Sequence, residues 1–248
     1  MKALDGKVAL VTGASKGIGA AIATVFAAAG ARVVVNYRQD EAGAADVVTD
    51  IRTLGSDAIA VQADISREED VQRLFEITQA HFGAPDIVVN NAGIFHHGAF
   101  STLSVKEMQQ QLNVNLLGTL LVCQQAAQRF PERGGCIINL SALSSQYSTP
   151  GSVMWAATKG AIDTLTQGLA RELGAKNIRV NALAPGLILT EGLLAAKKMN
   201  PQLKAQLLAA TPLGRFGLPE DVAQVALFLA SEDSAYVSGE RVLISGGV

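Results

Sequence analysis

The sequence predicts an α/β protein with a single-domain, Rossmann-type, doubly wound fold, in which helices flank a seven-stranded parallel sheet. Short apolar runs rich in β-branched residues recur along the 248 residues, with helix-length segments between them. The runs are apolar on both faces, as in parallel strands that helices cover on both sides. A glycine-rich turn follows the first run and opens the first helical segment, as in dinucleotide-binding folds.

Seven runs of four or five residues are predicted to form the strands of this sheet. Their length and composition are typical of buried strands, and the segments between them have helical periodicity. The predicted strands are Val8–Val11, Arg32–Asn36, Ala58–Gln62, Ile87–Asn90, Cys136–Asn139, Arg179–Leu183 and Arg241–Ile244.

Helices are predicted between the first four strands, and each ends at a glycine, which adopts the left-handed conformation of a helix stop without steric cost. Ser66-Arg-Glu-Glu69 has the spacing of a capping box ahead of the third helix. The helices and their stops are Ile18–Ala29 before Gly30, Glu41–Leu54 before Gly55, and Glu68–Phe82 before Gly83.

Residues 187–217 do not follow this alternation of strands and helices. They contain scattered leucines, Lys197-Lys198, Asn200-Pro201 and Thr211-Pro212. We predict a helical flap there, beside the substrate site. No linker, repeat or low-complexity segment divides the sequence, so residues 1–248 are expected to form one domain.

The composition is that of a protein with a large core and a small-molecule partner. About half of the residues are apolar (49%), 17% are charged, and the net charge is −2, which gives no reason to expect nucleic-acid binding. The apolar run near the start is too short for a signal peptide or a membrane helix, so we expect a cytoplasmic protein with no membrane partner. Two cysteines and three histidines, of which His96 and His97 are adjacent, predict neither a disulfide framework nor a metal site.

Gly13, Gly17 and Gly19 are the candidate pyrophosphate site. They follow a strand and open a helix, so backbone N–H groups and the helix N-terminus can approach an anion closely. The alternative for this Gly-x3-Gly-x-Gly spacing is a tight turn that needs small residues.

The end of the second strand indicates which dinucleotide binds. An acidic residue there would bond the ribose 2′-hydroxyl of NAD. This chain has Asn36-Tyr37-Arg38 instead, and Arg38 with Lys16 can compensate a 2′-phosphate. NADP(H) is therefore the preferred cofactor, and NAD(H) stays possible because Asp40 and Glu41 weaken the positive field.

The whole chain resembles the short-chain dehydrogenase/reductase family. The resemblance rests, in order and spacing, on Thr12-Gly-Ala-Ser-Lys-Gly-Ile-Gly19, Asn90-Asn-Ala-Gly93, Asn113-Val-Asn-Leu116, Lys159 and Pro185-Gly186. It implies that Asp64 faces the adenine, that Asn90, Ala92 and Gly93 line the adenosine side, and that Pro185, Gly186 and Thr190 lie against the nicotinamide. From the residues alone, Asp64 could equally be a helix N-terminal signal, and Pro185-Gly186 a plain turn. The full candidate set for the cofactor is Gly13, Ser15, Lys16, Gly17, Ile18, Gly19, Arg38, Asp64, Asn90, Ala92, Gly93, Lys159, Pro185, Gly186 and Thr190.

The resemblance also locates the reacting centre, where two expected groups are missing. Family members carry a Tyr four residues before the Lys and a Ser thirteen residues before that Tyr; here these positions are Trp155 and Ala142. Asn115, which would order water, and Lys159, which would grip the ribose, are retained, although a Lys in this setting is usually just helix surface. An indole N–H only donates a hydrogen bond and does not ionise usefully. Because a general acid is typically worth about 10²–10⁴-fold, ordinary ketone reduction is expected to be impaired.

Nearby residues could supply the missing proton. Tyr147 and His97 are the first candidates, although solvated loops are rich in such residues regardless of function. Ser141 is a weak substitute, because a shift of one residue at a strand end turns the side chain to the other face.

Three functions fit this pattern. The first is a reductase with an altered site that transfers hydride to an activated carbonyl or an imine or iminium, whose cation an indole face can hold. The others are a disabled carbonyl reductase variant and a non-catalytic NADP-binding protein. The family resemblance also implies a homotetramer, with helices equivalent to residues 103–129 and 151–173 at one interface.

Overall fold

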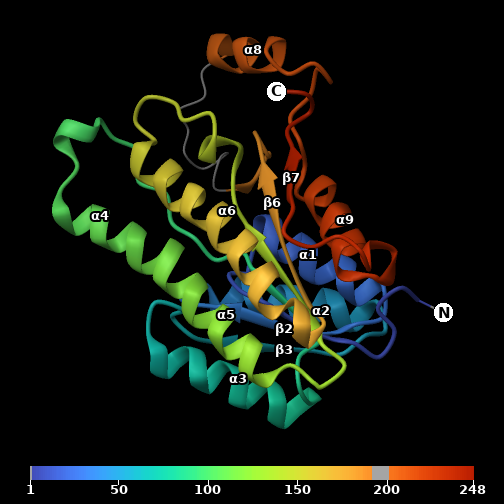
Figure 1. The fold of residues 1–248 in the computed structure, drawn as a ribbon. Coiled ribbons are helices and arrows are strands. Elements are labelled where there is room, and N and C mark those ends of the chain that lie inside the picture. Colours follow the sequence, from blue (N-terminus) through green and yellow to red (C-terminus); the bar gives the residue numbers. More distant parts are fainter. Residues whose placement is uncertain (1, 192–200) are drawn as a thin grey trace.

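The computed structural model describes residues 2–191 and 201–248. Its seven strands form one parallel sheet in the order β3-β2-β1-β4-β5-β6-β7 (Figure 1). All seven predicted strands are confirmed, and three of them extend one to three residues beyond the predicted ends. The strands are β1 Val8–Val11, β2 Arg32–Tyr37, β3 Ala58–Gln62, β4 Ile87–Asn90, β5 Gly135–Leu140, β6 Ile178–Pro185 and β7 Arg241–Ile244.

Helices cover both faces of the sheet (Figure 1). They are α1 Gly17–Ala28, α2 Glu41–Thr53, α3 Glu68–Phe82, α4 Val105–Gln111, α5 Gly118–Arg129, α6 Val153–Leu173, α8 Pro201–Ala209 and α9 Pro219–Ala230. The predicted glycine stops are confirmed, because Gly30, Gly55 and Gly83 all have positive φ directly after these helices or one residue later. Within the described residues, no helix is long and apolar enough to cross a membrane.

Successive residues of a strand point to opposite faces of the sheet, so each face has its own hydrophobic core. Val33 and Val35 of β2 pack with α1, α2 and α9, whereas Val34, between them, packs with α3 and α5 on the other face. Both sets are completely buried. This is why the central strands read as continuous apolar runs rather than alternating ones.

The predicted capping box before α3 is wrong. Arg67 is the N-cap residue and makes no capping bond with its side chain. The Ser66 hydroxyl instead donates to Asp64 Oδ1 at 2.7 Å, and the Asp64 N–H donates to Asp70 Oδ2 at 2.9 Å. The Ser66 N–H also donates to Asp64 Oδ1, at 3.0 Å, so this serine belongs to a turn around Asp64, one residue before the N-cap.

The predicted flap is partly described. Residues 201–209 form helix α8, which lies beyond the tip of β6 in Figure 1, at the carboxyl edge of the sheet. Ile188 and Gly217 form an isolated parallel bridge that closes the base of this segment. Lys197, Lys198 and Asn200 lie outside the described residues.

Candidate active site

The glycine-rich turn sits at the point where the strand order reverses. β1 lies between β2 and β4, so a crevice opens at their carboxyl ends, where open α/β sheets bind ligands. Gly13 has φ +60°, and a Cβ there would lie 2.8 Å from Ala92 Cα. Only glycine fits both this conformation and this contact, so the turn after β1 meets the loop after β4 directly.

The N-terminus of α1 is open to an anion. Lys16 is the N-cap residue and makes no capping bond with its side chain. The first-turn N–H groups of a helix have no acceptor within the helix and carry a partial positive charge. This end of α1 therefore fits the pyrophosphate of a dinucleotide.

Thr12 and Asn91 fix the two loops to each other. The Thr12 hydroxyl accepts from the N–H groups of Asn91 at 3.0 Å and Ala92 at 3.1 Å, and donates to Val89 O. The Asn91 side-chain amide donates to Thr12 O at 3.0 Å and Gly13 O at 2.9 Å. Neither side chain was assigned a role from the sequence, because the partners are about eighty residues apart in the chain and only the fold brings them together.

A cavity of about 330 Å³ lies beside this turn and brings together residues predicted for the adenosine side. A second hollow continues from Lys16 past Gly17 to Thr190, and a Cβ on Gly17 would lie 3.6 Å from Thr190 Cγ2. The segment after β6 therefore lies against the start of α1. The first cavity is lined by Gly13, Ser15, Lys16, Arg38, Asp64, Ala92 and Gly93, among others.

The two cations predicted to bind a 2′-phosphate, Lys16 and Arg38, each lie near a carboxylate. Lys16 Nζ lies 3.2 Å from Asp40 Oδ2, and Arg38 Nη1 lies 3.8 Å from Asp64 Oδ2. The Gly43 N–H and then Lys16 hold the pKa of Asp40 below its ordinary value. Because the side chains of Lys16 and Arg38 are 57% and 48% exposed, these ion pairs are weak and the cations can turn to another anion.

Asn115 lies in a π-helical turn, residues Leu112–Leu117, between α4 and α5. Its Oδ1 accepts from Ile94 N at 2.8 Å and its Nδ2 donates to Ile94 O at 2.9 Å. The side chain thus clamps the loop after β4. Single π-turns inside helices are frequent at functional sites, and none was predicted here from the residues.

Trp155 stands beside that loop. A Cβ on Gly93 would lie 3.7 Å from Trp155 Cζ3, and the Phe95 ring meets the indole edge-on at 5.5 Å between centroids. Lys159 follows four residues later on α6, on the same helix face. Its Nζ lies over the indole, 4.7 Å from the ring centroid. The indole therefore already binds a cation, and that cation is the Lys159 side chain.

Lys159 is buried, with 4% of its surface exposed. Its Nζ donates to the carbonyl oxygen of Leu140, the last residue of β5. Burial lowers the pKa of Lys159 from 10.5 to about 8, and the negative charge of Asp163 opposes this shift. The alternative of an ordinary surface lysine is therefore wrong.

Comparisons with known proteins identify the family of this chain. The family model described as Enoyl-(Acyl carrier protein) reductase matches residues 13–248. An uncharacterised oxidoreductase of Methylorubrum extorquens is 45% identical over 248 residues, 100% of both chains. A structure of a short chain dehydrogenase from Burkholderia cenocepacia in complex with NADP is 35% identical, with a TM-score of 0.92 over 99% of this chain and 98% of the other. The chain belongs to the short-chain dehydrogenase/reductase family.

Another solved short-chain relative holds the other cofactor. This 7α-hydroxysteroid dehydrogenase, complexed with NADH and 7-oxo glycochenodeoxycholic acid, is 36% identical, with a TM-score of 0.93 over 98% of this chain and 94% of that one. A nicotinamide dinucleotide is thus the cofactor of both relatives. The site of this short-chain dehydrogenase fits that group, through the open N-terminus of α1 and the Gly13 contact.

Ala142, the residue predicted to stand at the family's Ser position, contacts Arg241. Arg241 Nη2 donates to Ala142 O at 3.1 Å, and its Nε pairs with Asp163 Oδ2 at 3.1 Å. Ser141, one residue earlier, is buried and its hydroxyl donates to Lys159 O within α6. Ser141 is thus engaged by the helix backbone, and Arg241 is a site residue that the sequence did not reveal.

The two candidate proton donors differ in position. The His97 ring meets Phe95 edge-on at 6.1 Å, and Phe95 in turn contacts Trp155, so His97 lies at the rim of the site. Tyr147 is 65% exposed in the loop before α6. Asn90, predicted to contact the cofactor, turns its side chain into the core, where it donates to Asn139 Oδ1 at 2.9 Å.

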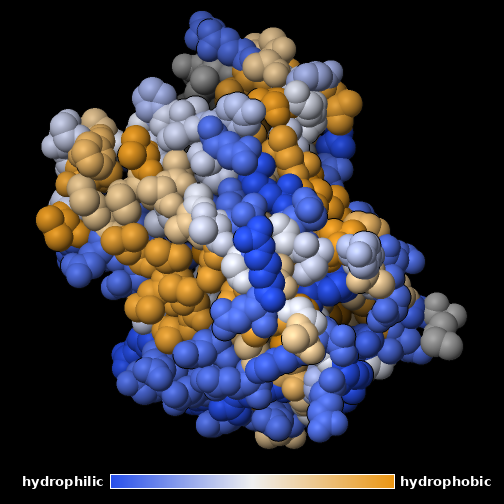
Figure 2. Space-filling model, in the orientation of Figure 1, coloured by the Kyte–Doolittle hydropathy of each residue, from blue (hydrophilic) through white to orange (hydrophobic). Residues whose placement is uncertain are grey.

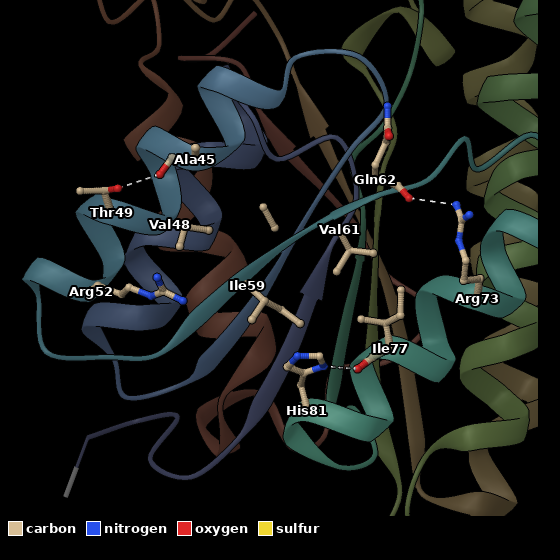
Figure 3. Close-up of a pocket in the computed structure, with 11 residues that line it drawn as sticks. Ala45, Val48, Thr49, Arg52, Ile59, Val61, Gln62, Arg73, Ile77 and His81 are labelled. Carbon is tan, nitrogen blue, oxygen red and sulfur yellow. Dashed lines mark hydrogen bonds between the residues drawn. The ribbon is translucent and has the colours of Figure 1, made fainter.

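A larger hollow, of about 730 Å³, lies elsewhere, between α2, α3 and the edge strand β3 (Figure 3). Arg73 donates there to Gln62 O at 3.1 Å, and Arg52 donates to Ala58 O at 2.9 Å. The two arginines occupy carbonyls at the ends of an edge strand, which is a known protection against strand pairing. None of the residues predicted for the cofactor or the reaction lines this hollow.

Proposed function

We propose that this chain is an NADP(H)-dependent reductase of the short-chain type with an altered active site, which transfers hydride to an activated carbonyl or an imine. The observation that carries the proposal is Trp155, which lies beside Lys159 and against Gly93, a residue that lines the cavity beside the glycine-rich turn. The bound dinucleotide supplies the hydride. Trp155 and Ala142 offer no hydroxyl to polarise the carbonyl oxygen ahead of hydride transfer, so substrates whose carbon is already electrophilic are favoured over ordinary ketones.

Lys159 narrows the substrate class further. Its ammonium occupies a face of the indole, so a permanently charged iminium would meet a like charge inside a buried site. Activated carbonyls avoid that repulsion and need no positive charge to be electrophilic. They are therefore the preferred substrates, and imines, which react as iminium ions, come second.

The preference for NADP(H) rests on Lys16 and Arg38. Both side chains are exposed beside the cavity after β2, and a 2′-phosphate there would compete with Asp40 and Asp64 for them. Guanidinium and phosphate form strong, often bidentate, hydrogen bonds. NAD(H) lacks this phosphate and is the weaker ligand in this proposal.

A second candidate function is a disabled carbonyl reductase or an NADP-binding protein without catalysis. It is favoured by the internal engagement of both retained groups, since Asn115 bonds Ile94 and Lys159 bonds Leu140. Consumption of NADPH by the chain, with a panel of ordinary ketones, activated ketones and cyclic imines, separates the two functions. The double variant Trp155→Tyr, Ala142→Ser is assayed in parallel with the unmodified chain. Turnover only in the double variant would overturn the reductase proposal.

We also propose that the chain associates with copies of itself. Large apolar side chains are exposed along α4, the π-turn and α5, where Figure 2 shows an apolar patch on this face of the molecule. Contiguous apolar surface commonly marks a protein interface. We expect a homotetramer by light scattering, and a monomer at micromolar concentration would contradict this expectation. The exposed residues are Val105, Leu112, Leu117 and Leu120.

A further inference from the structure

Lys159 is a buried cation without an anionic partner. None of the ion pairs among the described residues includes it, although it is 4% exposed. An unpaired ammonium inside a protein is expensive, so such groups are rarely kept without a function. The carboxylate nearest in sequence on the same helix face, Asp163, is held by Arg241 instead.

Lys159 lies on the side of α6 that carries Trp155, next to the candidate site. Trp155, Lys159 and Asp163 follow one another at intervals of four residues, so they form one stripe along α6. The ammonium, in the middle of the stripe, lies at the carboxyl end of β5 and beside the indole, which itself lies against Gly93. The described charged or titratable groups around it are Asp163 on α6, Arg241 from β7, and His97, whose ring packs on Gly151 just before α6.

Resting on the proposed reductase function, we infer that Lys159 itself is the general acid of this enzyme, in place of the missing phenol. Hydride from the reduced nicotinamide forms the new C–H bond and the C=O or C=N π pair moves to oxygen or nitrogen. The Lys159 ammonium gives that atom a proton, directly or through one water, and becomes a neutral amine. The products are an alcohol or amine and oxidised cofactor, and solvent returns the proton to Lys159.

The acidity of the ammonium suits this role. Burial lowers the pKa of Lys159 to about 8, so the group is protonated at neutral pH yet gives up its proton far more readily than an exposed lysine. A general acid works best when its pKa lies near the working pH. The rate of reduction should therefore fall as pH rises through about 8, because the protonated form is required.

The chain carries its own reporter for this ionisation. Trp155 is its single tryptophan, and the Lys159 ammonium lies over its ring. Loss of that charge changes the electric field across the indole and shifts its emission. We expect the fluorescence of the protein without cofactor to show a step with a midpoint near pH 8. The step should be absent in Lys159→Met and present in Lys176→Met, which removes an exposed lysine beyond the far end of α6.

The same variants, with Lys159→Arg, are then compared in NADPH consumption with an α-diketone between pH 6 and 10. Arginine keeps the positive charge but does not release a proton in this range. We expect Lys159→Arg and Lys159→Met to lower kcat by about 10²–10⁴-fold. In the unmodified chain, kcat should follow the fluorescence step, and Lys176→Met should behave like that chain.

Each outcome decides a different point. A missing fluorescence step, or turnover that survives in Lys159→Arg or does not follow the step, would overturn the role of Lys159 while leaving the reductase function in place. No turnover by the unmodified chain with any substrate would overturn the reductase function, and this inference with it. Circular dichroism of the variants confirms that each is folded before its rate is read.

Discussion

The buried charge of Lys159 should lower the free energy of unfolding, and this destabilisation should disappear as the pH rises. The pKa of its ammonium is 10.5 when exposed and about 8 in the folded protein. One pKa unit corresponds to about 1.4 kcal/mol, so the burial penalty is about 3 kcal/mol. The penalty is complete below pH 8, where both states hold the proton. It fades between pH 8 and 10.5, because the unfolded state then binds more protons than the folded state.

Lys159→Met keeps most of the side-chain volume and removes the charge. We expect the variant to unfold at higher urea than the unmodified chain at pH 7. Its advantage in free energy of unfolding should shrink by about 2 kcal/mol at pH 9.5, which follows from the two pKa values.

The assay is urea unfolding followed by circular dichroism at one protein concentration, since subunit association also contributes to stability. Lys176→Met serves as the control for loss of an exposed charge, and its difference from the unmodified chain should not change over this pH range. A variant at Lys159 that is less stable at pH 7, with a difference that pH does not alter, would refute the reasoning.

Three further changes probe the cofactor cradle. Gly13→Ala should abolish measurable NADPH binding by calorimetry, because its Cβ would strike Ala92, whereas Gly6→Ala has the same kind of backbone strain with no atom within 4 Å and should bind normally. Arg38→Ala should lower NADPH affinity by roughly tenfold or more and leave NADH affinity unchanged, and an equal loss for both would remove Arg38 from the 2′-phosphate site. Thr12→Val leaves two N–H groups without their acceptor and should lower the free energy of unfolding by about 1–3 kcal/mol, while Thr49→Val, on an exposed helix face, should change it little.

The sheet and the glycine-rich turn were predictable because their signals are local. Apolar runs and helix stops depend on neighbouring residues, and β1, β3, β4 and β7 matched their predicted ends. The capping box failed because the N-cap is Arg67, one residue after Ser66, and the serine forms a turn with Asp64 instead.

The interior of the site could not be predicted because it depends on distant contacts. Thr12 and Asn91, or Arg241 and Asp163, meet only in the folded chain. The four-residue spacing of Trp155 and Lys159 places them on one face of α6. It gave no indication that this face is buried, and that burial is what changes the acidity of the lysine.

The comparison that tests the account most directly is the rate of NADPH oxidation with an activated ketone against a simple ketone of the same size. The account predicts turnover of the activated ketone by the unmodified chain and little of the simple one. In the double variant Trp155→Tyr, Ala142→Ser, the simple ketone should gain about 10²–10⁴-fold. An unmodified chain that reduces neither ketone nor an imine, or reduces both ketones equally well, would contradict the account.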